Sequence, residues 1–552
     1  MLESMAASPP SAPAVLARRG LLKGLGAGGA AVALAGLAGC TGEPASGAAG
    51  SSSTDPTTGA SPGGSAAPAE TAAITAAGVD RAVEALPGII ERYLQQTTVP
   101  GLAFAVVYEG KVRYLEGFGL REVGKPETID PDTVFQLASV SKPISSTVVA
   151  AAFTQKLGKL GWDDAIHDTL PGFRLSDPWV EEHVTAADLF AHRSGLPDHS
   201  GNLLEDLGYD RAEILARHRF YPLRRFRDNY EYTNYGLTAG AEAIAVSAGV
   251  PWEKLAQQVL FQPLKMTSSS FDFADLQKRT NRAAMHKRID GAWVPNLEAD
   301  YDPQAPAGSA TSSLRDMTVW ASILLAGGEP LLETKQLQRI WQPTAVKPAL
   351  PDIGHAASFY GLGWNVNYEP TGELRVSHSG AFGRGAATSI TLFPALGLGI
   401  VGLTNGEPVA LPEAITVEFT DHVRYGKSTQ ENWLDVIAPY VTPEETADQK
   451  KYAQPATDPT KARSLSAYEG RYANDFYGTL TVSARGEQLS FTVGPAGLVF
   501  DLQHYSGDEF FFDTVGEDDS GFSGAIFAGS GSGQKLTINA WNKEKLGTFT
   551  RG

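Results

Sequence analysis

The stretch Leu137-Ala138-Ser139-Val140-Ser141-Lys142-Pro143 places a hydroxyl and an amine three residues apart at the predicted start of a helix. Residues i and i+3 lie on one face of a helix, so the side chains of Ser139 and Lys142 can touch. A lysine that has lost its proton through burial can deprotonate such a serine. This S-x-x-K pattern is typical of acyl transfer by an active-site serine. Taken alone, it also fits a helix N-cap serine followed by a solvated lysine, and Ser532–Lys535 repeats it in a Gly/Ser-rich turn.

The segments before this stretch predict a helix and a β-hairpin. Val79–Gln95 has apolar residues at helical spacing. Gly101–Tyr108 and Lys111–Phe118 are rich in apolar and aromatic residues, and Glu109-Gly110 separates them. They therefore predict two antiparallel strands joined by a tight turn. Val134–Leu137 predicts a short extended piece that leads directly to the serine.

Pro143 locates the start of the predicted helix. Proline is tolerated only in the first turn of a helix, so the helix begins close to Ser139. The hydroxyl then lies near a helix N-terminus, where the partial positive charge favours a developing oxyanion. The chain continues through Leu157 as a largely apolar run. Such a run predicts a helix that is buried in the centre of the domain.

Composition and charge describe a globular protein with room for more than one domain. Hydrophobic residues make up 42% of the 552 residues, and the formal net charge is -17. No cluster of Lys and Arg is present, which argues against a nucleic-acid partner because phosphate binding requires one. Cys40 is the single cysteine. A disulfide within the chain is therefore excluded.

The first 40 residues predict an export signal. Arg18-Arg19 is followed by Ala30–Leu37, which is too short and too rich in Gly and Ala to span a bilayer as a mature helix. Leu37–Cys40 resembles the bacterial lipobox, in which the thiol is lipidated and the peptide is cut just before it. We therefore expect residues 1–40 to be a twin-arginine-type lipoprotein signal peptide, and Cys40 to tether the exported protein to the extracytoplasmic face of a membrane. An uncleaved anchor helix, a free thiol or a cleaved but unlipidated signal are the alternatives.

Residues 41–75 predict a disordered tether. They are almost entirely Gly, Ala, Ser, Thr and Pro, with too little apolar bulk to offset the entropy of ordering them. Gly59–Gly63 within this tract matches the G-x-S-x-G nucleophile elbow. That motif needs a strand-turn-helix setting, which such a tract cannot supply. An α/β-hydrolase is therefore disfavoured.

Four motifs occur together in one order: Leu137–Pro143, Leu189–Pro197, Tyr232–Gly236 and His378–Gly380. In order and rough spacing they resemble the serine β-lactamase and penicillin-binding-protein superfamily, and most of all its class C-like branch. That branch holds class C β-lactamases, family VIII esterases, D-aminopeptidases and D-Ala-D-Ala carboxypeptidases. The resemblance spans roughly Val79–Tyr425 and includes these accessory stretches: Pro263–Met266, Pro306–Ser309, Asp316-Met317 and Tyr360–Trp364.

The resemblance implies roles for residues of the first and third motifs. Ser139 would be the nucleophile, and Tyr232 would act with Lys142 as general base or proton shuttle. Asn234 lies two residues after Tyr232, so both side chains can enter one cleft, and it would orient Lys142 and the substrate amide. A phenol that acts as a general base needs a pKa below its usual value of ~10. We expect nearby ammonium groups or a desolvated lysine to lower the pKa of Tyr232. The alternative for Tyr232 is a core aromatic residue with a satisfied hydroxyl.

The tripeptide His378-Ser379-Gly380 is expected on an edge strand opposite the nucleophile. In the family this tripeptide is most often Lys-Thr-Gly and lines the cleft, where glycine lets a substrate approach the backbone. The N–H groups of Ser139 and Ala381 would then form the oxyanion hole. Histidine is mostly neutral near pH 7, so it attracts a substrate carboxylate less than lysine would. Histidine in place of lysine at this position favours an esterase or peptidase over a β-lactamase. It also predicts that the affinity for carboxylate-bearing substrates rises as the pH falls toward the histidine pKa.

The other histidines do not indicate a metal site, and no metal or organic cofactor is implied. The chain has no His-Glu-x-x-His, and His183, His192 and His199 are spaced too irregularly to share a helix face. His192 is interpreted as a structural residue of its loop. The isolated histidines are interpreted as ordinary surface or core residues: His167, His286 and His504.

A second domain boundary is predicted near Ala438. Residues 431–463 are charged and contain prolines, which predicts a linker with one short helix. Residues 464–552 alternate polar and apolar residues in short runs, a pattern typical of a small antiparallel sheet or barrel. We expect this domain, which carries no acid/base constellation, to shield or shape the cleft. The runs are Tyr472–Phe476, Gly478–Ser483, Gln488–Val493, Glu509–Asp513, Gly524–Phe527 and Leu536–Asn539.

Residues 76–430 are therefore expected to adopt the α/β (α+β) β-lactamase-like transpeptidase fold, with an antiparallel sheet flanked by helices and a helical lobe, followed by a small all-β domain. The expected function is that of an exported, lipid-anchored serine hydrolase. It would cleave ester or amide bonds, including those of D-amino-acid peptides, through an acyl-enzyme on Ser139. The alternatives are a β-lactamase, a D-Ala-D-Ala carboxypeptidase, or a catalytically silent envelope sensor that binds peptidoglycan peptides or β-lactams.

Overall fold

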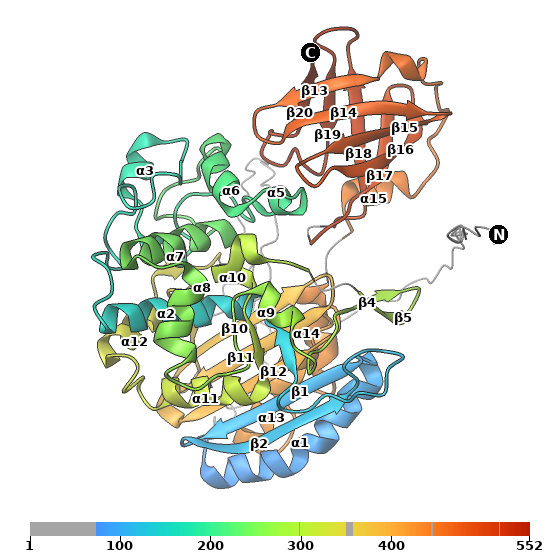
Figure 1. The fold of residues 1–552 in the computed structure, drawn as a ribbon. Coiled ribbons are helices and arrows are strands. Elements are labelled where there is room, and N and C mark those ends of the chain that lie inside the picture. Colours follow the sequence, from blue (N-terminus) through green and yellow to red (C-terminus); the bar gives the residue numbers. More distant parts are fainter. Residues whose placement is uncertain (1–72, 297–298, 349–356, 443–444, 518) are drawn as a thin grey trace, which may run out of the picture. The chain divides into compact units, whose positions relative to one another are not determined.

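The computed structural model describes residues 73–296, 299–348, 357–442, 445–517 and 519–552. They form a large domain that combines one antiparallel sheet with helices, and a C-terminal all-β domain (Figure 1). The predicted fold class is therefore confirmed. In the described part of the chain, no helix combines the length and the apolar character needed to cross a membrane.

The large sheet contains eight strands in the order β2-β1-β12-β11-β10-β9-β8-β7, and neighbouring strands run antiparallel. The predicted hairpin is present as its first two strands, with Glu109-Gly110 at the turn. The bounds are β1 Gly101–Tyr108, β2 Lys111–Gly119, β7 Ala345–Val346, β8 Phe359–Tyr360, β9 Asn365–Tyr368, β10 Leu374–Phe382, β11 Ala386–Phe393 and β12 Leu398–Thr404. Two-stranded sheets outside this one join β3 Val134–Gln136 to β6 Thr311–Ser313, and β4 His286–Ile289 to β5 Ala292–Pro295.

Helices cover both faces of the central strands, and every residue of β1, β11 and β12 is buried. A side chain added at Gly402 would meet Pro412 of α13, whereas one added at Gly399 would meet Ala321 of α11. Residues three apart on a strand point to opposite faces, so these two helices lie on opposite sides of the sheet. This explains why the central strands are continuously apolar rather than alternating. The helices are α1 Ala76–Thr97, α11 Leu314–Leu325, α12 Thr334–Trp341 and α13 Leu411–Tyr425.

The segment that carries Ser139 lies between the sheet and a helical lobe. Ser139 is the middle residue of the short 3-10 helix η1, Ala138–Val140, which runs directly into α2, Ser141–Thr154. The predicted helix start is confirmed, and the helix ends three residues before the predicted Leu157. Nearly all of α2 is buried. The lobe contains α3 Pro178–His183, α4 Ala186–Phe190, α5 Asn202–Asp206, α6 Arg211–Arg217, η2 His218–Phe220, α7 Asn234–Ala248, α8 Trp252–Ala256, the π-helix η3 Gln257–Phe261, α9 Phe273–Gln277, η4 Asp302–Gln304 and α10 Ala305–Gly308.

The prediction that His378–Gly380 lies on an edge strand is wrong in one respect. Its strand, β10, lies between β9 and β11 in the sheet. However, β9 pairs only with residues 374–377, whereas β11 pairs with residues 376–382. In the described residues, the half of β10 that carries the tripeptide therefore has β11 as its single strand partner. That half keeps one backbone edge free because β9 ends early.

The C-terminal domain is a closed eight-stranded barrel. The sequence predicted a small antiparallel sheet or a barrel, and the barrel is the form observed. The sequence patterns did not single out its fourth and eighth strands. The strands are β13 Gly470–Asn474, β14 Gly478–Arg485, β15 Gln488–Val493, β16 Leu498–Ser506, β17 Glu509–Asp513, β18 Phe522–Ala528, β19 Lys535–Ile538 and β20 Thr548–Arg551. The remaining short 3-10 helices are η5 Pro394–Leu396 and η6 Leu465–Ala467.

Two helices lie in the range predicted as a linker, α14 Trp433–Val441 and α15 Ala447–Tyr452. The first belongs to the large domain, because the indole of Trp433 is buried and donates to Asp421 of α13 at 2.9 Å. The second packs on the barrel, where Asp448 accepts from the backbone N–H of Gly524 at 2.7 Å.

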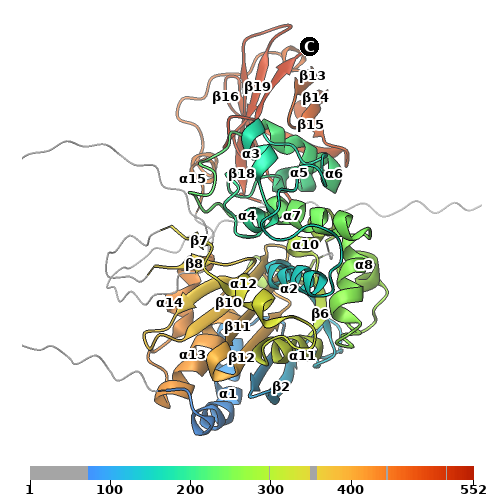
Figure 2. The same cartoon turned by 90° about the vertical axis from the view of Figure 1, so that its left-hand side faces the viewer.

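The barrel contacts the helical lobe along α5 and α6 (Figure 2). Tyr209 donates to the carbonyl of Tyr477 at 2.9 Å, and the N–H of Ala496 donates to the carbonyl of Leu207 at 3.1 Å. Arg217 donates to the carbonyl of Phe476. The same segment of the lobe holds residues that contact the candidate site.

Candidate active site

Ser139 occupies a strained turn between β3 and α2. The residue before it, Ala138, has φ of 48°, a left-handed conformation that a non-glycine residue adopts at a cost. The Ala138 side chain is fully buried, and Ser139 itself is partly exposed. The turn therefore presents the Ser139 hydroxyl to solvent at the N-terminal end of a buried helix.

Lys142 lies one turn later and is completely buried. Its Nζ is 2.9 Å from Ser139 Oγ and donates to the carbonyl of Ala307 at 3.0 Å. Burial lowers the pKa of this lysine well below its ordinary value. A neutral amine within hydrogen-bond distance of a serine hydroxyl can accept the hydroxyl proton, as the sequence predicts for this pair.

Tyr232 approaches Ser139 from the other side and donates to Ser139 Oγ at 2.7 Å. The expectation that its pKa is lowered is wrong. Burial raises it, and the negative charge of Asp198 raises it further, although the hydrogen bond to Ser139 opposes the rise. The reason is that the nearby lysine is held neutral and supplies no full positive charge. Tyr232 is therefore a phenol that donates a hydrogen bond, and Lys142 is the better base.

Two residues hold the backbone of Tyr232 in place. Its N–H donates to Asp198 Oδ1 at 3.1 Å, and its carbonyl accepts from the N–H of His199 at 2.8 Å. His192 packs its ring 4.6 Å from the Tyr232 ring, and its Nδ1 accepts from the N–H of Thr233 at 3.1 Å. His192 is buried, and burial lowers its pKa well below the ordinary value. These contacts are those of a positioning residue beside Tyr232.

Asn234 is the first residue of α7, two residues after Tyr232. Its side-chain amide donates to Asn202 of α5 at 3.3 Å. In the part of the chain that the structure describes, Lys142 makes no hydrogen bond to Asn234, and the buried Oδ1 of Asn234 has no partner. Asn234 is thus near the site, but α5 rather than Lys142 orients it.

His378 faces the site from β10 but is hydrogen-bonded to the protein at both ring nitrogens. Nδ1 donates to the carbonyl of Ser379 at 2.7 Å, which leaves Nε2 as the acceptor for the hydroxyl of Tyr360 at 2.9 Å. Burial lowers the pKa of His378 to about 3, although the hydrogen bond to the Ser379 carbonyl opposes this shift. The imidazole is therefore neutral, and its predicted protonation near its ordinary pKa is wrong.

Gly380 brings the backbone of β10 against the nucleophile. A Cβ at this position would lie 2.3 Å from the carbonyl oxygen of Leu137 and 3.0 Å from the amide nitrogen of Ser139, so only glycine fits. The next residue, Ala381, is exposed. This close approach is the geometry that the predicted pair of oxyanion donors requires, the N–H groups of Ser139 and Ala381.

The side chain of Ser379 points away from the cleft. Strand alternation places it on the face opposite to His378 and Gly380. There its hydroxyl interacts with the carboxyl of Glu413 on α13. Cys40 lies outside the described residues. Among the residues that the structure describes, no group of three or more His, Cys, Asp or Glu side chains could hold a metal ion.

Residues 86–419 match the Beta-lactamase family, a range that contains every predicted cleft residue from Ser139 to Ala381. The chain belongs to the beta-lactamase family. Residues 454–547 match a second family, described as a domain of unknown function (DUF3471), and this range covers most of the barrel.

Several relatives of this beta-lactamase family member are known. The unguisins hydrolase ungD' of Aspergillus campestris is 26% identical over 57% of this chain and 60% of its own length. Protein flp of Staphylococcus aureus is 25% identical over 61% of this chain and 66% of its own. Penicillin-binding protein 4* of Bacillus subtilis is 23% identical over 62% and 74%. The chain thus spans less than two thirds of the length of the first two relatives.

Solved structures show the same fold. The octameric penicillin-binding protein homologue from Pyrococcus abyssi superposes with a TM-score of 0.56 at 19% identity, over 85% of this chain and all of that one. The class C beta lactamase from Rhodobacter sphaeroides has a TM-score of 0.51 at 19% identity, over 62% of this chain and 98% of that one. These likenesses concern the fold of this beta-lactamase family member, and its chemistry rests on the side chains described above.

Sequence reasoning missed three residues of the site. Asp198 follows the motif Leu189–Pro197 by one residue, and only its contact with Tyr232 reveals its role. Ala307 contributes a carbonyl, and its place in the accessory stretch Pro306–Ser309 was the available signal. Tyr360 could have been found from the sequence, because it belongs to the accessory stretch Tyr360–Trp364 of the family resemblance. The rest of that stretch supports α2, because the indole of Trp364 donates to Ser146 at 3.1 Å.

Proposed function

We propose that this member of a serine hydrolase family cleaves ester or amide bonds through an acyl-enzyme on Ser139. One observation carries the proposal: the Ser139 hydroxyl lies between a buried lysine amine at 2.9 Å and a phenol at 2.7 Å. A catalytically silent binder has no need of a desolvated base beside its serine. The names of two relatives, a hydrolase and a penicillin-binding protein, support chemistry on an acyl compound.

The steps follow from these positions. The neutral amine of Lys142 accepts the Ser139 proton while Oγ attacks the substrate carbonyl carbon, and the carbonyl electron pair moves to oxygen. The N–H groups of Ser139 and Ala381 stabilise that oxyanion. The oxyanion collapses, the bond to the leaving group breaks, and the proton on Lys142 passes to the leaving group through Tyr232, which touches Ser139 Oγ. Water then attacks the acyl-enzyme by the same route and releases the acid.

The neutral His378 determines which substrates suit the site. A carboxylate next to the scissile bond would gain on the order of 1.5 to 3 kcal/mol from a charged hydrogen bond. The imidazole of His378 cannot provide this hydrogen bond, because both of its nitrogens are already hydrogen-bonded to Tyr360 and to the Ser379 carbonyl. We therefore propose short esters or uncharged D-amino-acid amides as good substrates, and β-lactams as slow acylators at best.

Steady-state constants for a p-nitrophenyl ester, a D-Ala amide and a cephalosporin test this assignment. We expect the wild type to prefer the ester and the amide, and this preference to stay constant from about pH 8 to about pH 5, because His378 does not titrate there. His378→Lys should raise cephalosporin turnover relative to the ester by about tenfold. His378→Gln, which stays neutral, is the matched control. Faster cephalosporin than ester hydrolysis by the wild type would identify a β-lactamase instead.

We further propose that the protein is exported and held at a membrane by a lipid on Cys40, on the basis of the twin arginines, the short apolar run and the lipobox-like Leu37–Cys40. The wild type, expressed in a bacterium with twin-arginine export, should partition into the detergent phase and carry a diacylglyceryl mass at its N-terminus. Cys40→Ser should lose both properties. Detergent partitioning of Cys40→Ser equal to that of the wild type would exclude the lipid anchor.

A further inference from the structure

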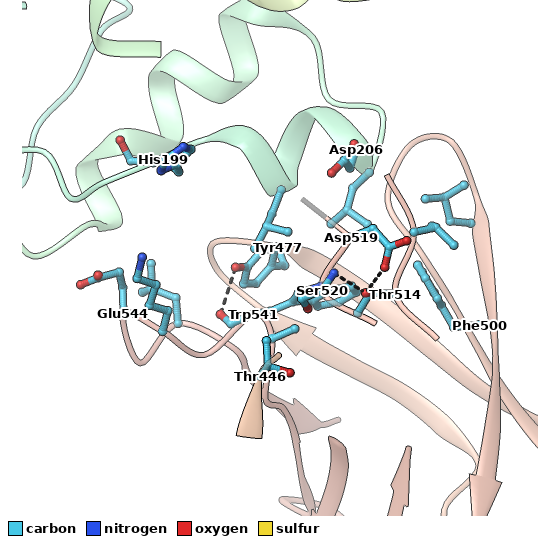
Figure 3. Close-up of a pocket in the computed structure, with 18 of the residues that line it drawn as sticks. His199, Asp206, Thr446, Tyr477, Phe500, Thr514, Asp519, Ser520, Trp541 and Glu544 are labelled. Carbon is cyan, nitrogen blue, oxygen red and sulfur yellow. Dashed lines mark hydrogen bonds between the residues drawn. The ribbon is translucent and has the colours of Figure 1, made fainter. Parts of the chain in front are cut away.

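A cavity of about 490 Å³ lies where one end of the barrel meets the helical lobe (Figure 3). Barrel side chains form one wall, including Tyr477, Phe500 and Trp541. The lobe forms the other wall with His199 and with Leu207, beside α5. Both the mouth of a β-barrel and the contact between two domains are preferred places for small-molecule sites. An eight-stranded barrel has room for one small ligand.

Part of the barrel wall of this cavity is aromatic. Phe500 and Phe512 alternate with exposed neighbours on their strands and face the barrel interior. Each packs against Trp541, with ring centroids 6.0 Å and 6.4 Å apart. The hydroxyl of Tyr477 donates to the carbonyl of Trp541 at 3.0 Å (Figure 3). These aromatic rings are fixed by their own packing, so the wall does not depend on a ligand to form.

The cavity begins beside the catalytic group. His199 lines it, and the His199 ring lies 5.6 Å from the ring of Tyr232, whose hydroxyl contacts Ser139 Oγ. Asp198, which also lines the cavity, holds the N–H of Tyr232. Tyr232 therefore contacts both Ser139 and a residue that lines the cavity.

Charge at the edge of the cavity selects against acids. The lining contains the carboxylates of Asp198, Asp206, Asp519 and Glu544 against the single ammonium of Lys543. Lys287 partly neutralises Asp519 at 3.4 Å. Glu544 is partly neutralised by Arg224 at 2.7 Å, whereas a further carboxylate entering this cavity would meet excess negative charge. An uncharged apolar group meets aromatic rings and gains from burial.

We propose that this cavity binds a bulky uncharged apolar group, aromatic or branched aliphatic, that the substrate carries beyond its scissile ester or amide bond. This inference rests on the proposed function and names the substrate class of the same site. The barrel then has a direct part in specificity, since it supplies the wall against which the substrate packs.

Leu498→Trp and Val499→Trp form a matched pair for testing this proposal. Leu498 lines the cavity, whereas Val499, the next residue of β16, is 54% exposed and points outward. The measured quantity is the kcat/KM ratio of a bulky over a small substrate, in two series: p-nitrophenyl 4-phenylbutyrate over p-nitrophenyl acetate, and 2-naphthyl acetate over phenyl acetate. Leu498→Trp should lower at least one ratio by about tenfold, and Val499→Trp should change neither. Both ratios unchanged in Leu498→Trp would overturn the proposal.

Binding of the neutral fluorescent probe N-phenyl-1-naphthylamine gives a readout that does not require turnover. The wild type and Val499→Trp should bind it with equal affinity, and Leu498→Trp should bind it about tenfold more weakly. Equal binding by all three proteins would place the probe elsewhere and contradict the proposal. If the wild type hydrolyses no ester, the proposed function fails while probe binding still tests the cavity. If circular dichroism shows that Leu498→Trp is misfolded, Val515→Trp narrows the same cavity from a neighbouring loop.

Discussion

Replacing Ser139 with alanine is expected to lower kcat/KM for p-nitrophenyl acetate by on the order of 10⁴- to 10⁶-fold, and to abolish labelling by a fluorophosphonate probe. The hydroxyl is the atom that Lys142 and Tyr232 both contact, so its removal leaves base and phenol without a nucleophile. Because Ser139 is partly exposed and its side chain is small, the thermal midpoint should remain near that of the wild type.

Ser532→Ala is the matched control for this experiment. Ser532 begins the second S-x-x-K copy, lies in an exposed turn of the C-terminal domain, and has no buried lysine beside it. We expect this variant to retain full labelling and full turnover. Labelling of Ser139→Ala at the wild-type level would assign the nucleophile to another residue. Absence of both labelling and turnover in the wild type would instead favour a silent binding protein.

Replacing Lys142 with methionine should lower kcat/KM by about 10²- to 10⁴-fold, the usual contribution of a general base. Methionine keeps the apolar stem and removes the amine that accepts the Ser139 proton. In contrast to the loss of activity, the free energy of unfolding at neutral pH should rise, because burial of a lysine that is protonated in the unfolded chain is costly.

The pH dependence of stability separates this explanation from general damage to the fold. The pKa of Lys142 is lower in the folded protein than in the unfolded chain, so the unfolded chain binds more protons between these two values. Wild-type stability should therefore rise with pH in that window, and the advantage of Lys142→Met should shrink as the pH approaches about 10.4, the ordinary lysine value. Chemical denaturation at several pH values measures this difference. An advantage that stays constant with pH would show that Lys142 is not buried in the neutral form.

Local sequence patterns were sufficient where the structure depends on neighbours in the chain. The three-residue spacing of Ser139 and Lys142, with proline in the first turn, predicted that these side chains meet, and they do. The hairpin of β1 and β2 followed from two apolar runs around Glu109-Gly110. The barrel strands β16 and β20 were missed. In the first, two successive exposed polar residues, Gln503 and His504, break the alternation, and the second has only four residues, so neither shows a strong pattern of its own.

Residue types and their spacing along the chain were enough to indicate the family, the order of the motifs and the pairing of Ser139 with Lys142. The protonation states depend on the folded chain. Lys142 and His378 are neutral because residues distant in sequence bury them. The hydroxyl of Tyr360, eighteen residues before His378, donates to Nε2 of His378. The cavity beside Tyr232 likewise exists only where α5 meets a barrel that begins more than two hundred residues later. Burial and long-range contact set both features, and neither leaves a local pattern in the sequence.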